Sequence, residues 1–453
     1  MNYVPKYDAG FKPMINVLRE FTRDAEREGS SPLKLCVERN GGYNYIYEMK
    51  IFAAEDKNER NYAVAERIVK ALLWVCGGYK IYVSGSKYIA DRLKQDYSAT
   101  GKRAFDADFM SGVYERPFEV VYAEGEEFPK LNKCSLKVGG NLNGCRIGFD
   151  AGGSDRKVSA VIDGVPVYSE EVVWHPKTQS DPQYHYDGIM AAMKTAASKM
   201  PRVDAIGVSS AGVYIDNKIM VASLFLKVPK DQFESKVKNM YIDIAKEFGC
   251  PLEVANDGDV TSLAGAMDLG DDRILGIAMG TSEAGGYINE EGGLNGWLSE
   301  LAFVPVDADP DAMADEWSGD IGCGVKYFSQ DSVIKLAAAA GVKFEEGLSP
   351  AEKLKQVQGM FGDGSGIAEQ IFRDIGYYLG YTIPFYAEFY SIKHVLLLGR
   401  VTSGKGGDIV LSAAREVLDN EFPEYSSIKI EMPDESNRRV GQSIAAASLP
   451  ACK

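Results

Sequence analysis

The chain contains 453 residues, of which 45% are hydrophobic and 25% charged, and its net charge is −15. These values are ordinary for a globular protein of two or three domains. The acidic balance argues against non-specific binding to nucleic acid, because such binding depends on Lys and Arg neutralising phosphates. The N-terminus lacks the apolar core of a signal peptide, and no run is long and apolar enough to span a membrane. We therefore expect a cytoplasmic protein that binds neither membranes nor nucleic acids.

Residues 1–140 are predicted to form a mixed α/β domain. Hydrophobic periodicity predicts helices at 11–28, 62–74 and 89–96, and strands at 36–52 (a pair around a Gly41-Gly42 turn), 79–83 and 117–122. This segment holds 22 Lys and Arg against 20 Asp and Glu, so it is nearly neutral. The stretch 124–144, with an acidic run, a proline and glycine turns, indicates the domain boundary.

After that boundary the pattern restarts and predicts two similar α/β lobes, 141–255 and 256–453, with the last helix able to return to the first lobe. Strands are predicted at 146–150, 157–161, 165–171, 205–209, 252–255, 274–279 and 395–398. Helices are predicted at 187–199, 233–248, 259–267, 353–360, 367–390 and 440–449. Ser349 and Glu352 form a capping-box pattern at one helix start, and Pro384 predicts a kink in another.

The first motif with chemical content is a strand that ends in Asp150 and a glycine turn, Gly152-Gly153-Ser154, followed by Lys157. Glycines let the backbone approach a ligand closely, and successive backbone N–H groups in such a turn bind anions. An aspartate at this position can hold Mg²⁺ through water, because that ion prefers oxygen ligands and keeps several waters. The alternative is a hairpin turn with an incidental aspartate.

Two further motifs follow the same logic. A buried strand runs into Gly280-Thr281, a glycine turn whose hydroxyl can bond a phosphate oxygen. Another strand ends in Asn256-Asp257 just before a helix, where a carboxylate can accept the proton of an attacking hydroxyl group. The alternative is that these residues only cap the helix, and here Asp259 is the better-placed cap.

The ordered set of motifs resembles the ROK family (repressors, open reading frames, sugar kinases) of the actin/hexokinase/Hsp70 ATPase superfamily. The motifs are D-x-G-G-S at 150–154, G-V-S-S-A-G at 207–212, N-D at 256–257, G-T-x-x-x-G-G at 280–286, S-E-L at 299–301 and L-L-L-G-R-V at 396–401. The resemblance implies two actin-like (ribonuclease H-like) α/β lobes with a ligand cleft between them. The N-terminal α/β domain is an addition that the resemblance does not cover.

The resemblance also implies roles for individual residues. Asp257 matches the catalytic base, and Asn256, Gly212 and Glu300 match groups around the sugar. The phosphate and ATP-binding positions are Asp150, Gly152, Gly153, Ser154, Lys157, Gly280, Thr281, Gly285, Gly286, Gly399 and Arg400. The implied cofactors are ATP and Mg²⁺, the latter held through water at Asp150, and the implied assembly is a homodimer.

Several positions depart from the family pattern. A histidine that usually follows the sugar-binding glutamate is Phe303, and two other sugar contacts are replaced by Val325 and Ser223. The zinc knuckle is reduced, in residues 316–323, to two glycines and Cys323, so we expect no zinc. Arg400 replaces a glycine of the adenosine turn, where it can either stack on adenine or obstruct the site.

The sequence therefore predicts an ATP-dependent kinase for a hydroxyl group of a hexose or amino-hexose. The alternatives are a sugar-sensing regulator without catalysis and an actin-like ATPase that acts on a protein partner. Trp174 and His175 are residue types that can bind sugars, but we predict that this pair is structural.

Overall fold

The structure, a computed structural model, describes residues 1–133, 138–433 and 435–451, without the side chains of 435–440. It divides into two compact units. Unit 1 comprises Met1–Cys134, Ile277–Gly285 and Trp297–Met432, and unit 2 comprises Ser135–Gly276, Gly286–Gly296 and Pro433–Lys453. Residues 134–137, within the predicted boundary segment, lie outside the described residues.

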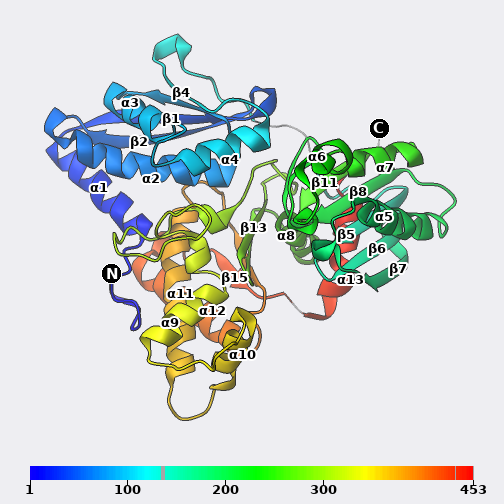
Figure 1. Ribbon diagram of the computed structural model, residues 1–453. Coiled ribbons are helices and arrows are strands. Elements are labelled where there is room, and N and C mark those ends of the chain that lie inside the picture. The colour runs from blue at the N-terminus through cyan, green and yellow to red at the C-terminus, as the bar shows by residue number, and fades with distance from the viewer. Residues whose placement is uncertain (134–137, 434, 452–453) are drawn as a thin grey trace. The chain divides into compact units, whose positions relative to one another are not determined.

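The N-terminal part of unit 1 is a four-stranded sheet of order β2-β1-β3-β4 with helices packed on it (Figure 1). Its elements are α1 (Met14–Glu28), β1 (Ser30–Glu38), β2 (Asn44–Phe52), α2 (Asn58–Cys76), β3 (Lys80–Ser84), α3 (Lys87–Asp96), α4 (Ala104–Tyr114) and β4 (Glu119–Tyr122). β1 pairs antiparallel with β2 and with β3, and β3 pairs parallel with β4. The predicted strand pair is confirmed, and both turn glycines have positive φ, Gly41 at 75° and Gly42 at 73°.

The rest of unit 1 contains most of a second sheet, of order β13-β12-β14-β15, with four helices. Its elements are β12 (Ile274–Met279), β13 (Glu283–Ile288), α9 (Gln330–Ala339), α10 (Pro350–Gly359), α11 (Ile367–Tyr386), β14 (His394–Leu398), α12 (Lys405–Glu421) and β15 (Lys429–Glu431). The capping box is confirmed, because the Ser349 hydroxyl accepts from Glu352 and the Glu352 carboxylate accepts from Ser349. The second half of helix α11 is almost entirely buried, as its largely apolar sequence there requires, whereas Arg373 in the first half is exposed.

Unit 2 is built on a five-stranded sheet of order β11-β8-β5-β6-β7. Its elements are β5 (Cys145–Ala151), β6 (Asp155–Ile162), β7 (Val165–Val173), α5 (Pro182–Ala197), β8 (Ala205–Ser210), β9 (Val213–Ile215), β10 (Lys218–Val221), α6 (Lys230–Gln232), α7 (Met240–Phe248), β11 (Leu252–Asn256), α8 (Asp257–Leu269) and α13 (Glu435–Ala447). β5, β8 and β11 run parallel, whereas β6 and β7 continue as an antiparallel meander. The carboxyl ends of the three parallel strands therefore share one edge of this sheet.

The C-terminal helix α13 packs on this sheet, beside β5 and β8 (red in Figure 1). Two glycines make the close approach possible. A Cβ at Gly148 would lie 1.7 Å from the Ser443 carbonyl oxygen, and a Cβ at Gly207 would lie 1.7 Å from that of Ala446. Any side chain at either strand position would therefore push the helix off the sheet.

Some elements differ from the sequence-based expectations. The helix predicted at 233–248 is broken, with a π-helical segment over Phe233–Val237 separating α6 from α7. The predictions also missed α4, α9, α12, β9, β10, β13 and β15. Most of the missed strands are short, and short strands carry too little alternation to be recognised. Among the helices of the described residues, none is long and apolar enough to cross a membrane.

Candidate functional site

Asp150 lies near the carboxyl end of β5 in unit 2. The residue is buried, with only 5% of its surface exposed. The Ser209 hydroxyl donates to its Oδ1 at 2.9 Å, and Lys157 Nζ lies 3.7 Å from Oδ2. Burial raises the pKa of Asp150 to about 6, against the opposing effects of Lys157 and Ser209. The Ser209 hydroxyl on the neighbouring strand therefore fixes the orientation of the carboxylate. A further cation nearby would stabilise its charged form.

The glycine turn after β5 is open to solvent at Gly153 and Ser154. Its backbone is anchored from behind by Trp174, whose Nε1 donates to the Gly152 carbonyl at 2.7 Å. A Cβ at Gly152 would lie 2.7 Å from the Asp155 carbonyl oxygen, so the tight return into β6 explains that glycine. Lys157 points back to carboxylates, with Nζ 3.0 Å from Asp155 Oδ1. Its charge is therefore largely satisfied within the protein.

Asp257 is the first residue of α8, and its neighbour caps the helix. The Asn256 side chain accepts from the Gly258 N–H at 2.7 Å and donates to the Gly212 carbonyl at 2.7 Å. Our assignment of the cap to Asp259 is wrong, because that carboxylate accepts from the Tyr287 N–H at 3.2 Å instead. Asn256 is a strong cap by itself, so the Asp257 carboxylate is available for chemistry.

The electrostatics around Asp257 also favour a reactive carboxylate. Burial raises its pKa, while the Gly258 N–H and the nearby Lys177 ammonium act in the opposite direction. Its charge in turn helps to raise the pKa of Asp150, so the two carboxylates lie close enough to interact. A pair of interacting carboxylates, one buried and one half-buried, with few cations beside them is an arrangement that occurs at catalytic sites.

The second glycine turn lies between β12 and β13. Gly280 and Thr281 form its tip, and the Thr281 side chain is exposed, as a phosphate ligand requires. Gly285 and Gly286 lie within β13 instead. A Cβ at Gly285 would lie 2.6 Å from the Ser299 carbonyl oxygen, and one at Gly286 would lie 2.2 Å from that of Gly258. Packing alone therefore explains these two glycines.

The residues predicted to contact adenosine lie after β14 in unit 1. Gly399 has a φ of 96°, and a Cβ there would lie 2.3 Å from the Met279 carbonyl oxygen. Arg400 is exposed, and its carbonyl accepts from Gln358 Nε2 at 3.0 Å. The backbone of this turn is therefore well defined, while the arginine side chain extends into solvent.

The segment around Glu300 is held by the N-terminal part of unit 1. The N–H groups of Ser299 and Glu300 donate to the carbonyls of Val75 and Trp74, both at 2.9 Å. These carbonyls lie in the last turn of α2, where no intrahelical donor is available to them. Phe303, which stands where family members carry histidine, stacks on the Trp74 ring with centroids 4.2 Å apart.

The segment that corresponds to the zinc knuckle is anchored by ion pairs. Asp320 lies 2.8 Å from Arg67, 2.7 Å from Lys70 and 2.9 Å from Arg103, all contributed by the N-terminal part of unit 1. Cys323 is buried beside this cluster. Within the described ranges, no group of three or more His, Cys, Asp or Glu side chains is arranged to hold a metal ion.

Sequence reasoning missed several residues of these sites. Ser209 lies in the G-V-S-S-A-G motif at 207–212, but no function was predicted for it. Gln442 of α13 donates to its hydroxyl oxygen at 3.1 Å. Glu283, at the start of β13, is buried, and burial raises its pKa to about 8. Lys177 was overlooked because it lies in a segment with no motif. Trp174 is structural as predicted, through its bond to the glycine turn.

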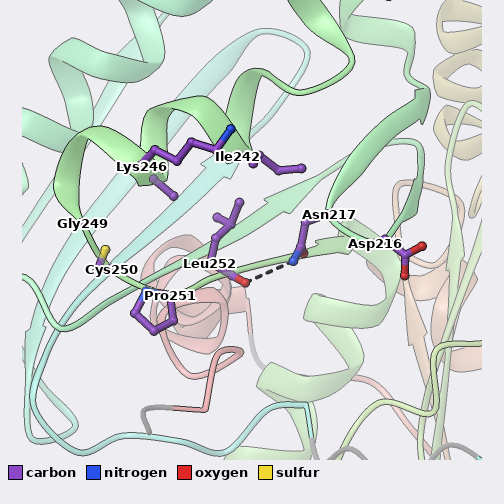
Figure 2. A pocket seen from close by; sticks show the side chains of 9 residues that line it. Asp216, Asn217, Ile242, Lys246, Gly249, Cys250, Pro251 and Leu252 are labelled. Atoms are coloured by element: carbon purple, nitrogen blue, oxygen red, sulfur yellow. Dashed lines mark hydrogen bonds between the residues drawn. The ribbon is translucent and has the colours of Figure 1, made fainter.

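A surface pocket of about 620 Å³ also lies in unit 2, beside α7 and the start of β11. Figure 2 shows Asn217 at its edge, donating from Nδ2 to the Leu252 carbonyl at 3.2 Å. Its lining includes none of the predicted site residues. The pocket therefore does not coincide with the candidate site.

No protein-family model and no curated protein matches the chain. Solved structures do show its fold. The ROK hexokinase from Thermus thermophilus superposes with a TM-score of 0.53 at 17% identity, covering 67% of this chain and 96% of the hexokinase. A ROK family transcriptional regulator, a homolog of the E. coli MLC protein, superposes with a TM-score of 0.51 at 17% identity, covering 68% of this chain and 79% of the regulator.

These likenesses confirm the expected α/β architecture of the actin-like ROK type. The match covers about two thirds of the chain, which leaves room for an additional N-terminal domain. Since the same fold is found in a sugar kinase and in a transcriptional regulator, fold alone does not choose between catalysis and sensing. That choice depends on the chemistry of the site.

Proposed function

We propose that the protein is an ATP-dependent sugar kinase, which transfers the γ-phosphoryl group of ATP to a hydroxyl group of a hexose or amino-hexose. The observation that carries this proposal is the Asp257 carboxylate. It is partly buried beside Asp150, it has a raised pKa, and its neighbour Asn256 performs the helix capping that would otherwise explain it. Helix capping therefore does not account for Asp257, and a carboxylate in this state is suited to accept the proton of an attacking hydroxyl group.

In the proposed reaction, Asp257 acts as the general base. The oxygen of the sugar hydroxyl attacks the γ-phosphorus, and its proton passes to the Asp257 carboxylate. The bond from the γ-phosphorus to the bridging oxygen breaks, and that oxygen leaves with ADP. Asn256, tied to the Gly212 carbonyl, is proposed to orient the sugar beside this base.

The residues around Asp150 fit a hydrated Mg²⁺ ion bound to nucleotide phosphates. Mg²⁺ is usually held by one or two carboxylates and keeps several waters, so one buried carboxylate with a fixed orientation suffices. Burial raises the pKa of Asp150, so its charged form would gain from a nearby cation. When bound, the ion would neutralise charge on the phosphates. Asp150 would hold it through water, and the Gly152–Ser154 turn would present backbone N–H groups to phosphate oxygens.

The candidate residues of unit 1 have complementary proposed roles. Gly280 and Thr281 would bind phosphate, and Gly399 and Arg400 would lie along the adenosine. Glu300 is proposed to accept hydrogen bonds from sugar hydroxyls. We further propose the division 1–140, 141–255 and 256–453 for domains, and a cytoplasmic homodimer, for which the size of the native protein in solution is the test.

The proposal is tested by measuring ATP consumption over a panel of hexoses and amino-hexoses, with the Asp257→Asn variant beside the wild type. We expect one or a few sugars to stimulate turnover, and the variant to lose that stimulation. If no sugar stimulates turnover while some sugar still binds, the proposal of a kinase is wrong.

A non-catalytic regulator is the second candidate, because a ROK transcriptional regulator shares the fold. Residues 1–140 speak against DNA binding, since their 22 basic and 20 acidic residues nearly cancel. A DNA mobility-shift assay at low salt, with and without sugars, separates the two candidates. Sugar-dependent retention of DNA would favour the regulator.

A further inference from the structure

The segment that follows β7 is fixed against the first glycine turn. Trp174 is 2% exposed, its indole donates to the Gly152 carbonyl at 2.7 Å, and its N–H donates to the Ser154 carbonyl at 3.1 Å. Two residues later, the Pro176 carbonyl lies 3.1 Å from Nε2 of the buried His185. The chain between these two anchors has little freedom, so the residue that follows is also well placed.

That residue is Lys177, and its side chain lies over the glycine turn. A Cβ at Gly153 would be 2.7 Å from Lys177 Cε and 2.9 Å from Nζ. The lysine therefore occupies space next to Gly153 that a larger residue would fill. The Lys177 ammonium thus lies beside the exposed turn formed by Gly153 and Ser154, whose backbone N–H groups are of the kind that bind anions.

The ammonium also interacts with Asp257, since it acts against the rise of that carboxylate's pKa. It thus lies near both the glycine turn and the proposed base. The two lysines of this region differ in what they bind. Lys157 is paired with Asp155 at 3.0 Å, whereas Lys177 has no ion pair with any residue of the described part of unit 2.

We propose that Lys177 is a catalytic residue that binds the γ-phosphoryl oxygens of ATP and stabilises their charge during transfer. This inference rests on the proposed kinase function. In the transfer, a bond forms between the sugar oxygen and the γ-phosphorus, the bond to the bridging oxygen breaks, and ADP leaves with that electron pair. The sugar proton goes to Asp257. Lys177 donates hydrogen bonds throughout and exchanges no proton.

The position of Lys177 suits this role physically. Phosphoryl transfer is accelerated mainly by positioning and by cations directed at the oxygens of the transferred group. A lysine that contacts the protein's own carboxylates is already neutralised, whereas an unpaired one gains most from a phosphate. When no nucleotide is bound, the same ammonium helps to keep Asp257 ionised.

The test uses the full-length chain with Lys177→Met, Lys177→Arg and the control Lys194→Met. Lys194 is an exposed lysine of α5 in the same unit, away from the turn. We expect Lys177→Met to lower kcat about 100-fold, with the arginine variant recovering most of it and the control unchanged. The Tm should stay the same, because the side chain is exposed.

A binding measurement makes the inference independent of turnover. Calorimetry should show that Lys177→Met weakens the binding of a non-hydrolysable ATP analogue at least several-fold and leaves ADP binding unchanged. An unchanged ratio of the two affinities, whether both stay the same or both fall equally, would overturn the role at the γ-phosphoryl group. If no sugar stimulates turnover of the wild type, the kinase proposal fails, but this ratio still decides whether Lys177 binds the γ-phosphate.

Discussion

Two groups of carboxylates, one in each unit, have opposite electrostatic environments. In unit 1, Asp320 is surrounded by Arg67, Lys70 and Arg103. Burial works to raise the pKa of Asp320, but these cations hold it well below its usual range. In unit 2, burial raises the pKa of Asp150 to about 6 and also raises that of Asp257, with only partial compensation by lysines.

The difference fits a structural role for Asp320 and a functional role for Asp150 and Asp257. A buried carboxylate that is fully paired with protein cations has no unused capacity for a ligand, and removing its partner is strongly destabilising. A buried carboxylate with too few cations destabilises the fold slightly and is retained where a ligand or proton supplies what is missing. Asp320 thus joins the N-terminal segment to the rest of unit 1 through its ion pairs, whereas for Asp150 and Asp257 we propose a chemical role.

The largest effect is expected for Asp257→Asn, which tests the functional role proposed for the unit 2 carboxylates. The amide has the same shape but does not accept a proton, so we expect kcat and kcat/KM to fall together by about 10²–10⁴-fold. The Tm should not change, because Asn256 caps the helix. The matched control is Asp259→Asn on the same helix, whose carbonyl still accepts from Tyr287. Retained turnover in Asp257→Asn would show that this carboxylate is not the base.

Asp320→Asn should have the opposite profile. It leaves three cations without their shared anion, two of them almost fully buried, and breaking such a buried pair costs about 3–5 kcal/mol of the free energy of unfolding. Urea unfolding measures this loss. The control is Glu48→Gln, which removes an exposed ion pair with Lys34 and should cost less than about 1 kcal/mol. Equal losses for both variants would contradict the structural role of Asp320.

Acidification from pH 7 to 5 should separate activity from stability. Asp150 has a raised folded pKa of about 6, so kcat/KM should fall below about pH 6 as it protonates. Its contribution to stability is greatest below its unfolded pKa of about 4 and is lost as pH rises through 6, so acidification does not destabilise the fold through it. Asp320 has a lowered pKa, and its contribution is lost only below about pH 4.

We therefore expect an acid limb in the activity profile near pH 6 with an unchanged or slightly higher Tm. Circular dichroism melts recorded at the same pH values as the rate measurements provide the check. A fall in Tm that parallels the fall in activity would mean that unfolding, not protonation of the site, causes the acid limb.

The smallest expected effect concerns the contact between α2 and the Glu300 segment. Phe303→Leu removes the ring that stacks on Trp74, and an aromatic pair of this type contributes about 0.5–1.5 kcal/mol. If this contact positions Glu300, the KM for sugar should rise ~3- to 10-fold with no change in the KM for ATP. Phe109→Leu is the control, because Phe109 touches the same tryptophan at 4.8 Å but lies outside that segment. Equal sugar KM values for both variants would contradict the positioning role.

Local sequence patterns determined much of the architecture. The Gly41-Gly42 turn, the capping box at Ser349 and the strand-to-glycine turn after Asp150 were predictable, because each depends on residues a few positions apart. The order of the motifs indicated the actin-like fold, which the superpositions confirm. The predicted helix boundaries were less accurate where local periodicity is weak, as at the π-helical segment Phe233–Val237.

The tertiary structure decided what no local pattern encodes. The burial of Asp150 is seen only in the assembled structure, as is the bond to the Gly212 carbonyl that holds the capping side chain of Asn256. The position of Lys177 over Gly153 depends on the Trp174 anchor, twenty-two positions away from Gly152. Each of these contacts joins residues distant in the chain, and their burial and charge environment, which set the pKa values of the site, exist only once the sheet and its helices have assembled.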